Sequence, residues 1–181
     1  MERKKLTLPE CAGPILEALP KGILLTTKAG GKVNSMVIGW GTIGIEWSAP
    51  VFVAYVREGR HTRTLLDAHP EFTVNAPGPG GVADKRIIAL CGGKSGRDLD
   101  KIAEAGLVLE EPEIVSVPAV RQMPLTLECR VVHRQSQDLS ALDPRFAHFY
   151  PQDVGGENVG ANRDPHVAYY GEIVSAYLLR D

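Results

Sequence analysis

The densest group of residues with recognisable binding chemistry lies between Arg57 and Thr64, where cations and hydroxyls are close together. Arg60, Thr62 and Arg63 complete the group, and the residues that follow are typical of a helix. Free N–H groups at a helix start, the helix dipole and a guanidinium together suit a phosphate. The group is a candidate phosphate site; the alternative is a solvated helix start whose arginines happen to be close.

A second candidate stretch runs from Asn34 to Thr42, where polar side chains are followed by glycines. The amide of Asn34 and the hydroxyl of Ser35 suit the polar edge of a flat heterocycle, and Trp40 suits one of its faces. Bare glycine backbone adds N–H groups at the rim of such a ring. The alternative is that Trp40 and Trp47 are core or dimer-interface aromatics.

Three glycines of this stretch, Gly39, Gly41 and Gly44, have the G-x-G-x-x-G spacing of dinucleotide-binding proteins. Such a site requires a helix directly after the glycines, because the pyrophosphate lies on its N-terminal N–H groups. Here the β-branched and aromatic run Val51–Val56 follows and predicts a strand. The glycines therefore join strand to strand, and a dinucleotide-binding fold is excluded.

The segment Cys91–Gly96 contains the Gly-Lys-Ser of a P-loop, but the position of its first glycine is occupied by Ile88. Cys91 borders a glycine turn at a helix end, whereas a helix N-terminus is what lowers a thiol pKa. Asn75, at the end of a predicted strand, has the same two interpretations as Trp40: ligand contact or core. We find no defensible Ser/His/Asp arrangement and no acid/base pair, which suggests that any reactive atom belongs to a bound cofactor.

Composition places the chain among ordinary globular proteins. It has 181 residues, 44% of them apolar and 23% charged, and a formal charge of −2, which favours one domain over residues 1–181 and disfavours a nucleic-acid partner. We expect no signal peptide and no membrane span. Three separated cysteines and five histidines without metal-ligand spacing indicate reduced thiols, a cytoplasmic location and no metal site.

The elements that position these residues are mostly strands. Helices are predicted over Pro9–Pro20 and Thr62–Ala68, and two more are predicted to start at Asp84 and Asp98. Strands are predicted over Gly22–Thr27, Lys32–Ile38, Val51–Val56, Glu71–Ala76, Leu107–Leu109, Leu125–Val131 and His166–Leu179, with a Gly30-Gly31 hairpin turn and a long Ser136–Pro165 loop. Strands do not alternate regularly with helices, so we expect a mainly β fold with a few helices, a closed or partly closed antiparallel barrel.

Taken together, the motifs resemble the flavin reductase-like proteins with an FMN-binding split barrel, a Greek-key antiparallel barrel. The resemblance runs from about Pro20 to Tyr177 and rests on five motifs in register. They are Asn34–Thr42, Arg57–Thr64, Glu71–Asn75, Cys91–Lys101, and Glu128-Cys129 with Tyr170–Ile173.

The resemblance implies a homodimer with one FMN per subunit, held near the dimer interface. By position, the ring would be lined by Asn34, Ser35, Met36, Val37, Ile38, Trp40, Gly41 and Thr42. The phosphate would meet Thr62, Arg63 and Thr64, in the cluster that begins at Arg57, the ring's polar edge would meet Asn75 and Ala76, and Cys91, Ser95 and Gly96 would complete the pocket.

The function that we expect is reduction of bound FMN by NADH or NADPH, with onward transfer to free flavin, ferric iron or a protein. One alternative is an FMN-containing electron carrier of the flavoredoxin kind that does not react with nicotinamide. Another is a flavin-free split barrel that binds heme or another ligand. The sequence leaves open the nicotinamide used, the electron acceptor and the choice between FMN and FAD.

Overall fold

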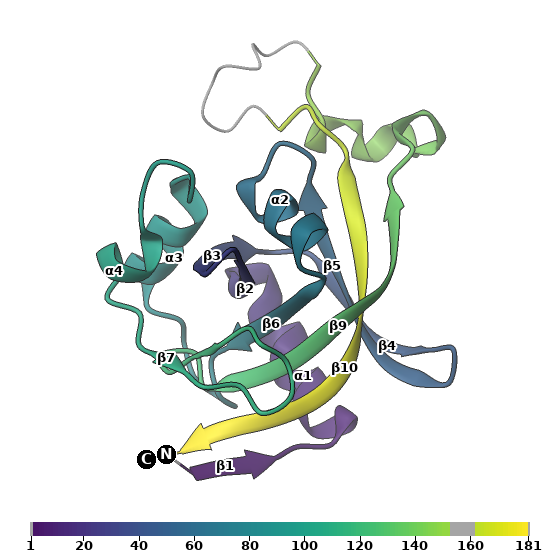
Figure 1. The fold of residues 1–181 in the computed structure, drawn as a ribbon. Coiled ribbons are helices and arrows are strands. Elements are labelled where there is room, and N and C mark those ends of the chain that lie inside the picture. Colours follow the sequence, from purple (N-terminus) through teal and green to yellow (C-terminus); the bar gives the residue numbers. More distant parts are fainter. Residues whose placement is uncertain (1, 153–161, 181) are drawn as a thin grey trace.

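A long antiparallel sheet organises the chain, and the structure, a computed structural model, describes residues 2–152 and 162–180. The strand order is β3-β2-β6-β9-β10-β5-β4, with β1 paired to β10. These strands are β1 (Glu2–Lys5), β2 (Ile23–Ala29), β3 (Lys32–Ile38), β4 (Gly41–Glu46), β5 (Ala49–Arg57), β6 (Glu71–Ala76), β9 (Leu125–Ser136) and β10 (His166–Arg180). Figure 1 shows β9 and β10 running the length of the molecule.

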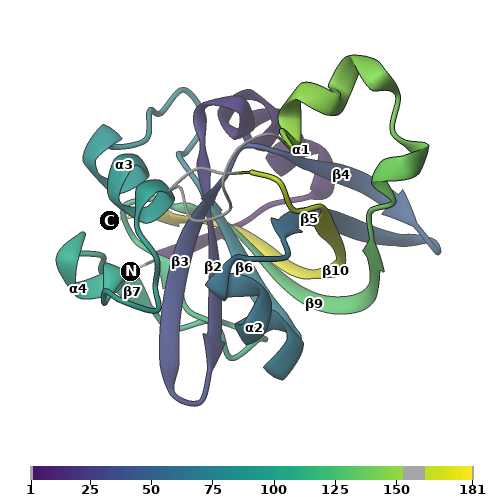
Figure 2. The same ribbon diagram turned by 90° about the horizontal axis from the view of Figure 1, so that it is seen from above.

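Helices and a small second sheet cover the large one. The helices are α1 (Leu8–Ala18), α2 (His61–Ala68), α3 (Lys85–Gly93) and α4 (Lys101–Glu104), with 3-10 turns η1 (Leu19–Lys21), η2 (Leu139–Ala141) and η3 (Pro144–Phe149). The second sheet pairs β7 (Leu109–Glu110) with β8 (Ala119–Val120). Seen from above in Figure 2, α2 and α3 lie on either side of β3. No helix of the described residues is long and apolar enough to cross a membrane.

The main core fills the inside of the curved sheet. Cys11 and Ile15 of α1 pack there against Phe52 of β5, Phe72 of β6 and Tyr169 of β10, and all five side chains are buried. A second cluster fills the space between the sheet and α3, where Ile87 and Cys91 pack with Leu24, Met123 and Val120. Both faces of β2 are therefore buried, which holds β3 in place beside it.

Most of the predicted elements are confirmed, and the fold is the mainly β split barrel that the sequence indicates. Gly30 and Gly31 both have positive φ, 55° and 77°, as the predicted hairpin turn requires. Some predictions were wrong in detail. The strand predicted over Leu107–Leu109 is observed over Leu109–Glu110. Residues 41–46 form a strand of their own instead of a connection, and α4 is capped by the Asp100 side chain, so it starts later than Asp98.

Candidate functional site

A cavity of about 640 Å³ opens beside β3 and is the centre of the candidate site. One wall is the start of α2, a second is the segment from Cys91 to Lys101, and a third is residues 162–164. Three segments far apart in sequence therefore meet at one edge of the sheet path, where β3 has no further strand beside it.

The start of α2 presents unused hydrogen-bond donors to this cavity. Arg60 is the N-cap, without a side-chain cap, so the helix starts at His61, one residue before the predicted start at Thr62. Asn34 of β3 donates an Nδ2–H to the Thr62 hydroxyl at 3.0 Å, and the hydroxyl proton of Thr62 has no acceptor within residues 2–152 and 162–180. The N–H groups of a helix start and a free hydroxyl proton make this corner suited to an anion.

The opposite wall brings a buried cation into the same cavity. Lys101 is only 4% exposed, and its ammonium donates to the Cys91 carbonyl at 3.1 Å. An ammonium has three protons, and the other two have no acceptor among the described residues. Burial lowers the pKa of Lys101. A buried cation with unused donors is a binding group for an anion, and the cavity is where such an anion can reach it.

Gly96 fixes how closely this wall approaches β3. A Cβ at this position would lie 2.1 Å from Oδ1 of Asn34 and 3.2 Å from Cδ2 of His61. Glycine is therefore the residue that lets the Ser95-Gly96 turn close against Asn34, next to its bond to Thr62.

The remaining charges at the cavity are mostly positive. Cationic residues outnumber carboxylates, and no ion pair between them occurs within residues 2–152 and 162–180. The cationic residues are Arg60, Lys94, Arg97, Lys101 and Arg163, and the carboxylates are Asp98 and Asp164. Burial, followed by the charges of Arg97 and Lys101, lowers the pKa of His61. The field in the cavity therefore favours an anion.

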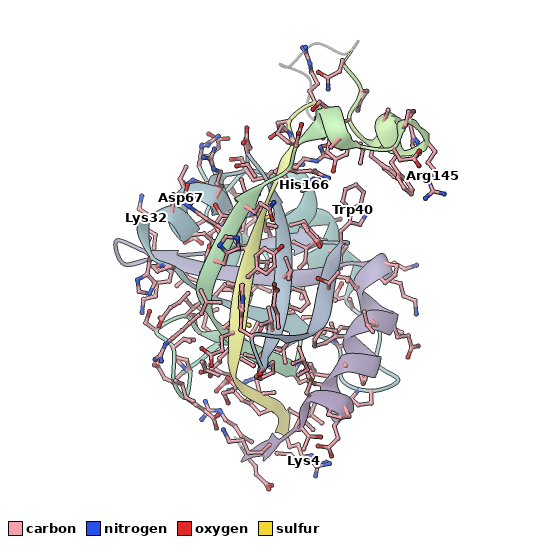
Figure 3. The ribbon with its side chains drawn as sticks, turned by 90° about the vertical axis from the view of Figure 1, so that its right-hand side faces the viewer. Lys4, Lys32, Trp40, Asp67, Arg145 and His166 are labelled. Atoms are coloured by element: carbon pink, nitrogen blue, oxygen red, sulfur yellow. The ribbon has the colours of Figure 1, made fainter. Side chains whose placement is uncertain are left out.

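A smaller cavity of about 160 Å³ adjoins the larger one and shares Met36, Val37, Arg60 and Asn162 with it. Its other polar and aromatic lining residues are Trp40, Tyr55, Arg57 and His166. Trp40 and His166 lie side by side, with ring centroids 5.1 Å apart (Figure 3).

His166 is held in one tautomer by a chain of hydrogen bonds. The Tyr150 hydroxyl donates to Oε1 of Gln137 at 2.7 Å, and that oxygen can only accept. The same hydroxyl lies 2.9 Å from Nδ1 of His166, so it must accept a proton from Nδ1. Nε2 is then the unprotonated nitrogen of a ring that lines the smaller cavity. Burial and the nearby Arg57 lower the pKa of His166 to about 4, which keeps the ring neutral.

Arg57 lies at the smaller cavity, away from the start of α2. Its guanidinium donates to the carbonyls of Phe149 at 2.9 Å, Asn162 at 2.9 Å and Asp164 at 2.8 Å. It also lies over the Tyr150 ring, 4.8 Å from its centroid. Its hydrogen bonds are thus to backbone carbonyls, whereas the sequence suggested a phosphate contact.

The structure brings together ten of the residues predicted for the site. Seven of them line the larger cavity: Asn34, Met36, Val37, Thr62, Cys91, Ser95 and Gly96. The smaller cavity adds Ile38, Trp40 and Arg57. Neither cavity is lined by the other seven: Ser35, Gly41, Thr42, Arg63, Thr64, Asn75 and Ala76.

Two of these seven, Asn75 and Ser35, belong to a buried polar network on the other side of the strands. Asn75 donates to the hydroxyls of Thr26 at 3.2 Å and Thr73 at 3.0 Å, and accepts from the Val120 N–H at 3.0 Å. The Ser35 hydroxyl lies 2.6 Å from that of Thr26. Their polar groups are used within the protein.

Two of the three phosphate residues predicted from sequence, Arg63 and Thr64, are engaged within the protein. Arg63 pairs with Asp67 at 3.4 Å, and the Thr64 hydroxyl donates to the His61 carbonyl at 2.7 Å. Sequence reasoning placed Lys101 only within a motif and named no ligand residue in the 136–165 loop. Lys101 could be recognised only through its burial, and Asn162 and His166 only through the path of the chain back to β3.

The fold and the cavities together define a class of protein, an antiparallel split barrel with a cationic ligand site at one sheet edge. The chain belongs to the flavin reductase like domain family, whose model matches residues 16–181. No curated protein matches the sequence.

Solved structures of this class share the fold at low identity. An FMN-binding domain of a flavin reductase-like enzyme from Shewanella baltica is 16% identical, with a TM-score of 0.68 over 98% of this chain and 77% of that one. A flavoredoxin from Methanosarcina acetivorans is 24% identical, with a TM-score of 0.61 over 88% and 68%. Nitrilotriacetate monooxygenase component B from Bacillus cereus is 17% identical, with a TM-score of 0.63 over 88% and 69%.

Proposed function

We propose that the chain is an FMN-binding oxidoreductase whose flavin is reduced by NADH or NADPH and then passes electrons to free flavin, ferric iron or a protein. The observation that carries the proposal is the anion corner of the larger cavity, where the start of α2 and the buried Lys101 face one ligand space. A phosphate dianion supplies the charge that this corner lacks. Family membership and FMN-binding neighbours support the choice of FMN.

The lining residues suit the phosphate and the ring of FMN. Thr62, the N–H groups of α2 and Lys101 would hold the phosphate. Met36 and Val37, which line both cavities, would hold the ring. When bound, FMN supplies an electron acceptor at N5 that takes a hydride from a reduced nicotinamide.

The smaller cavity supplies the space beside the ring that a second reactant needs. His166 offers it an unprotonated nitrogen, which accepts a hydrogen bond from an amide or hydroxyl of that reactant. Trp40 supplies an aromatic wall and exposes 40% of its surface. These residues bind and orient the reactant, and they exclude part of the water from the ring.

Flavin titration and rapid reduction test the proposal. Purified protein should be yellow or gain tight FMN on titration, and the flavin's visible absorption should be lost on rapid mixing with NADH or NADPH. A protein that binds FMN but is bleached only by a reduced partner protein would be the electron carrier. A colourless protein without FMN affinity would contradict both functions and leave the flavin-free barrel.

The proposal includes the homodimer that the resemblance implies and the cytoplasmic location that the separated cysteines indicate. The Trp47 side chain, 60% exposed on the β4–β5 hairpin, and the nearby Tyr170 and His133 rings form an aromatic surface suited to a second copy. Sedimentation of the FMN-loaded protein tests it, because a monomer with full FMN affinity would remove the interface from the proposal.

A further inference from the structure

One arginine joins the end of η3 to residues 162–164, which precede β10. Arg57, at the end of β5, is 9% exposed and donates to the carbonyls of Phe149, Asn162 and Asp164. The carbonyls of Asn162 and Asp164 precede β10, and the carbonyl of Phe149 is at the end of η3. A single planar guanidinium therefore fixes the distance between the two.

Further hydrogen bonds link residues 163–165 to Glu58 and Gly59, which follow Arg57, and to Gln152. The N–H of Glu58 donates to the Pro165 carbonyl at 3.1 Å, and the N–H of Gly59 donates to Oδ2 of Asp164 at 2.5 Å. Gln152 donates to the carbonyls of Tyr150 at 2.8 Å and Arg163 at 3.1 Å.

The smaller cavity depends on this arrangement. Asn162, His166 and Trp40 line it, and Trp40 packs edge-on against Phe149 with centroids 5.1 Å apart. Arg57 itself lies beneath these groups, 5.9 Å from the Trp40 ring centroid. The anion corner of the larger cavity is built from α2, β3 and Lys101, and the Arg57 side chain donates no hydrogen bond to any of them in the described residues. Residues 162–164, which Arg57 holds, contribute only the third wall of that cavity.

We propose that Arg57 is a positioning residue that sets the shape of the smaller cavity through backbone carbonyls, and so controls binding of the reactant that meets the flavin. The inference rests on the proposed function for the identity of that reactant, a reduced nicotinamide. It assigns Arg57 no contact with the phosphate, and it predicts that the two ligands respond differently to its loss.

The test compares Arg57→Lys and Arg57→Gln with the wild type. Lysine keeps the charge but cannot hold three carbonyls in a planar fork. We expect both variants to raise KM for NADH or NADPH about tenfold, a change of ~1.4 kcal/mol, because the lining of the smaller cavity is no longer held in place. The dissociation constant for FMN should stay within about twofold, a change of ~0.4 kcal/mol. The matched control is Arg134→Gln, an exposed arginine of β9 that pairs with Asp67.

A wild-type KM in Arg57→Lys would show that only the charge matters and would overturn the inference. Equal losses of FMN and nicotinamide binding would overturn it too, because Arg57 would then belong to the flavin site. If Arg57 variants fail to fold, Gln152→Ala is the second variant. It removes the exposed hydrogen bond from Gln152 to the Arg163 carbonyl, and it should raise the same KM by a smaller factor.

A measurement without flavin separates this inference from the proposed function. In a Trp47→Phe background, Trp40 is the remaining tryptophan, and its quenching by acrylamide reports the closure of the Phe149 side. Arg57→Lys should increase that quenching in the protein without ligands. If quenching increases in a protein that never binds FMN, the positioning role of Arg57 is supported and the proposed function is contradicted. Unchanged quenching would contradict the positioning role of Arg57.

Discussion

At the scale of single residues, the sequence motif and the structure assign different cationic residues to the phosphate. Arg63 is engaged with Asp67, whereas Lys101 is buried at the cavity with unused donors. We expect Lys101→Gln to weaken FMN binding roughly 10- to 100-fold, the loss of a charged hydrogen bond of about 1.5–3 kcal/mol. Arg63→Gln should change FMN affinity little. Fluorescence titration with FMN measures both, and the reverse order would restore the sequence-based assignment.

Substitution of Gly96 should also lower FMN affinity. Alanine at this position places a methyl group 2.1 Å from Oδ1 of Asn34, so Asn34 must move and its bond to Thr62 must break. We expect Gly96→Ala to reduce FMN affinity about tenfold, or ~1.4 kcal/mol, without unfolding the sheet. Gly44→Ala, with no neighbouring atom within 4 Å of the added Cβ, is the control. Equal titration curves for the two variants would argue against the close packing at Gly96.

His166 makes stability depend on pH. Its pKa falls from the ordinary 6.5 to about 4 in the folded protein, because burial and Arg57 disfavour the charged ring. The unfolded chain therefore takes up a proton at a higher pH than the folded chain does. The contribution of His166 is full above pH 6.5 and is lost as the pH falls from 6.5 to 4. Urea unfolding across this range should show the loss, and a His166→Gln variant should show a smaller slope; an unchanged slope would contradict the shift.

At the scale of elements, the buried carboxylate of Glu128 attaches the 113–115 segment to β9. It accepts the N–H groups of Glu113 at 2.7 Å, Ile114 at 2.7 Å and Val115 at 3.1 Å, and the hydroxyl of Tyr177 at 2.9 Å. Glutamine would turn an NH₂ group toward donors.

We therefore expect Glu128→Gln to lower the free energy of unfolding by about 3 kcal/mol, since buried donors lose their acceptor. Urea denaturation measures it, with the exposed Glu46→Gln as the control. A variant as stable as the control would mean that the segment is held by its other contacts.

Elements with a regular local pattern could be predicted from the sequence. β3, β6, β10 and the Gly30-Gly31 turn follow from local alternation and turn chemistry, so the sequence predicts them well. β4 was missed because Gly41 and Gly44 interrupt its pattern. The predicted site placed Asn34 and Ser35 together, although neighbours on a strand point to opposite faces. Asn34 reaches the cavity and Ser35 the buried network. Burial of Lys101 and the return of residues 162–166 to β3 depend on tertiary structure, which no local pattern encodes.

At the scale of the whole molecule, the net charge and the charge at the site have opposite signs. The chain carries −2 overall, yet the larger cavity gathers Arg60, Lys94, Arg97, Lys101 and Arg163 against two carboxylates. Over distances shorter than the Debye length of about 8 Å at physiological salt, the cavity field governs an approaching anion. The net charge alone would repel it.

The two effects predict opposite salt dependences for FMN association. If the cavity field dominates, the association rate should fall as salt is added, because screening weakens the attraction. If the net charge dominates, the rate should rise. Riboflavin, which lacks the phosphate, should show little dependence in either case. Stopped-flow fluorescence quenching of both flavins over a salt series measures the slopes, and a rate for FMN that rises with salt would contradict the assignment of its phosphate to this cavity.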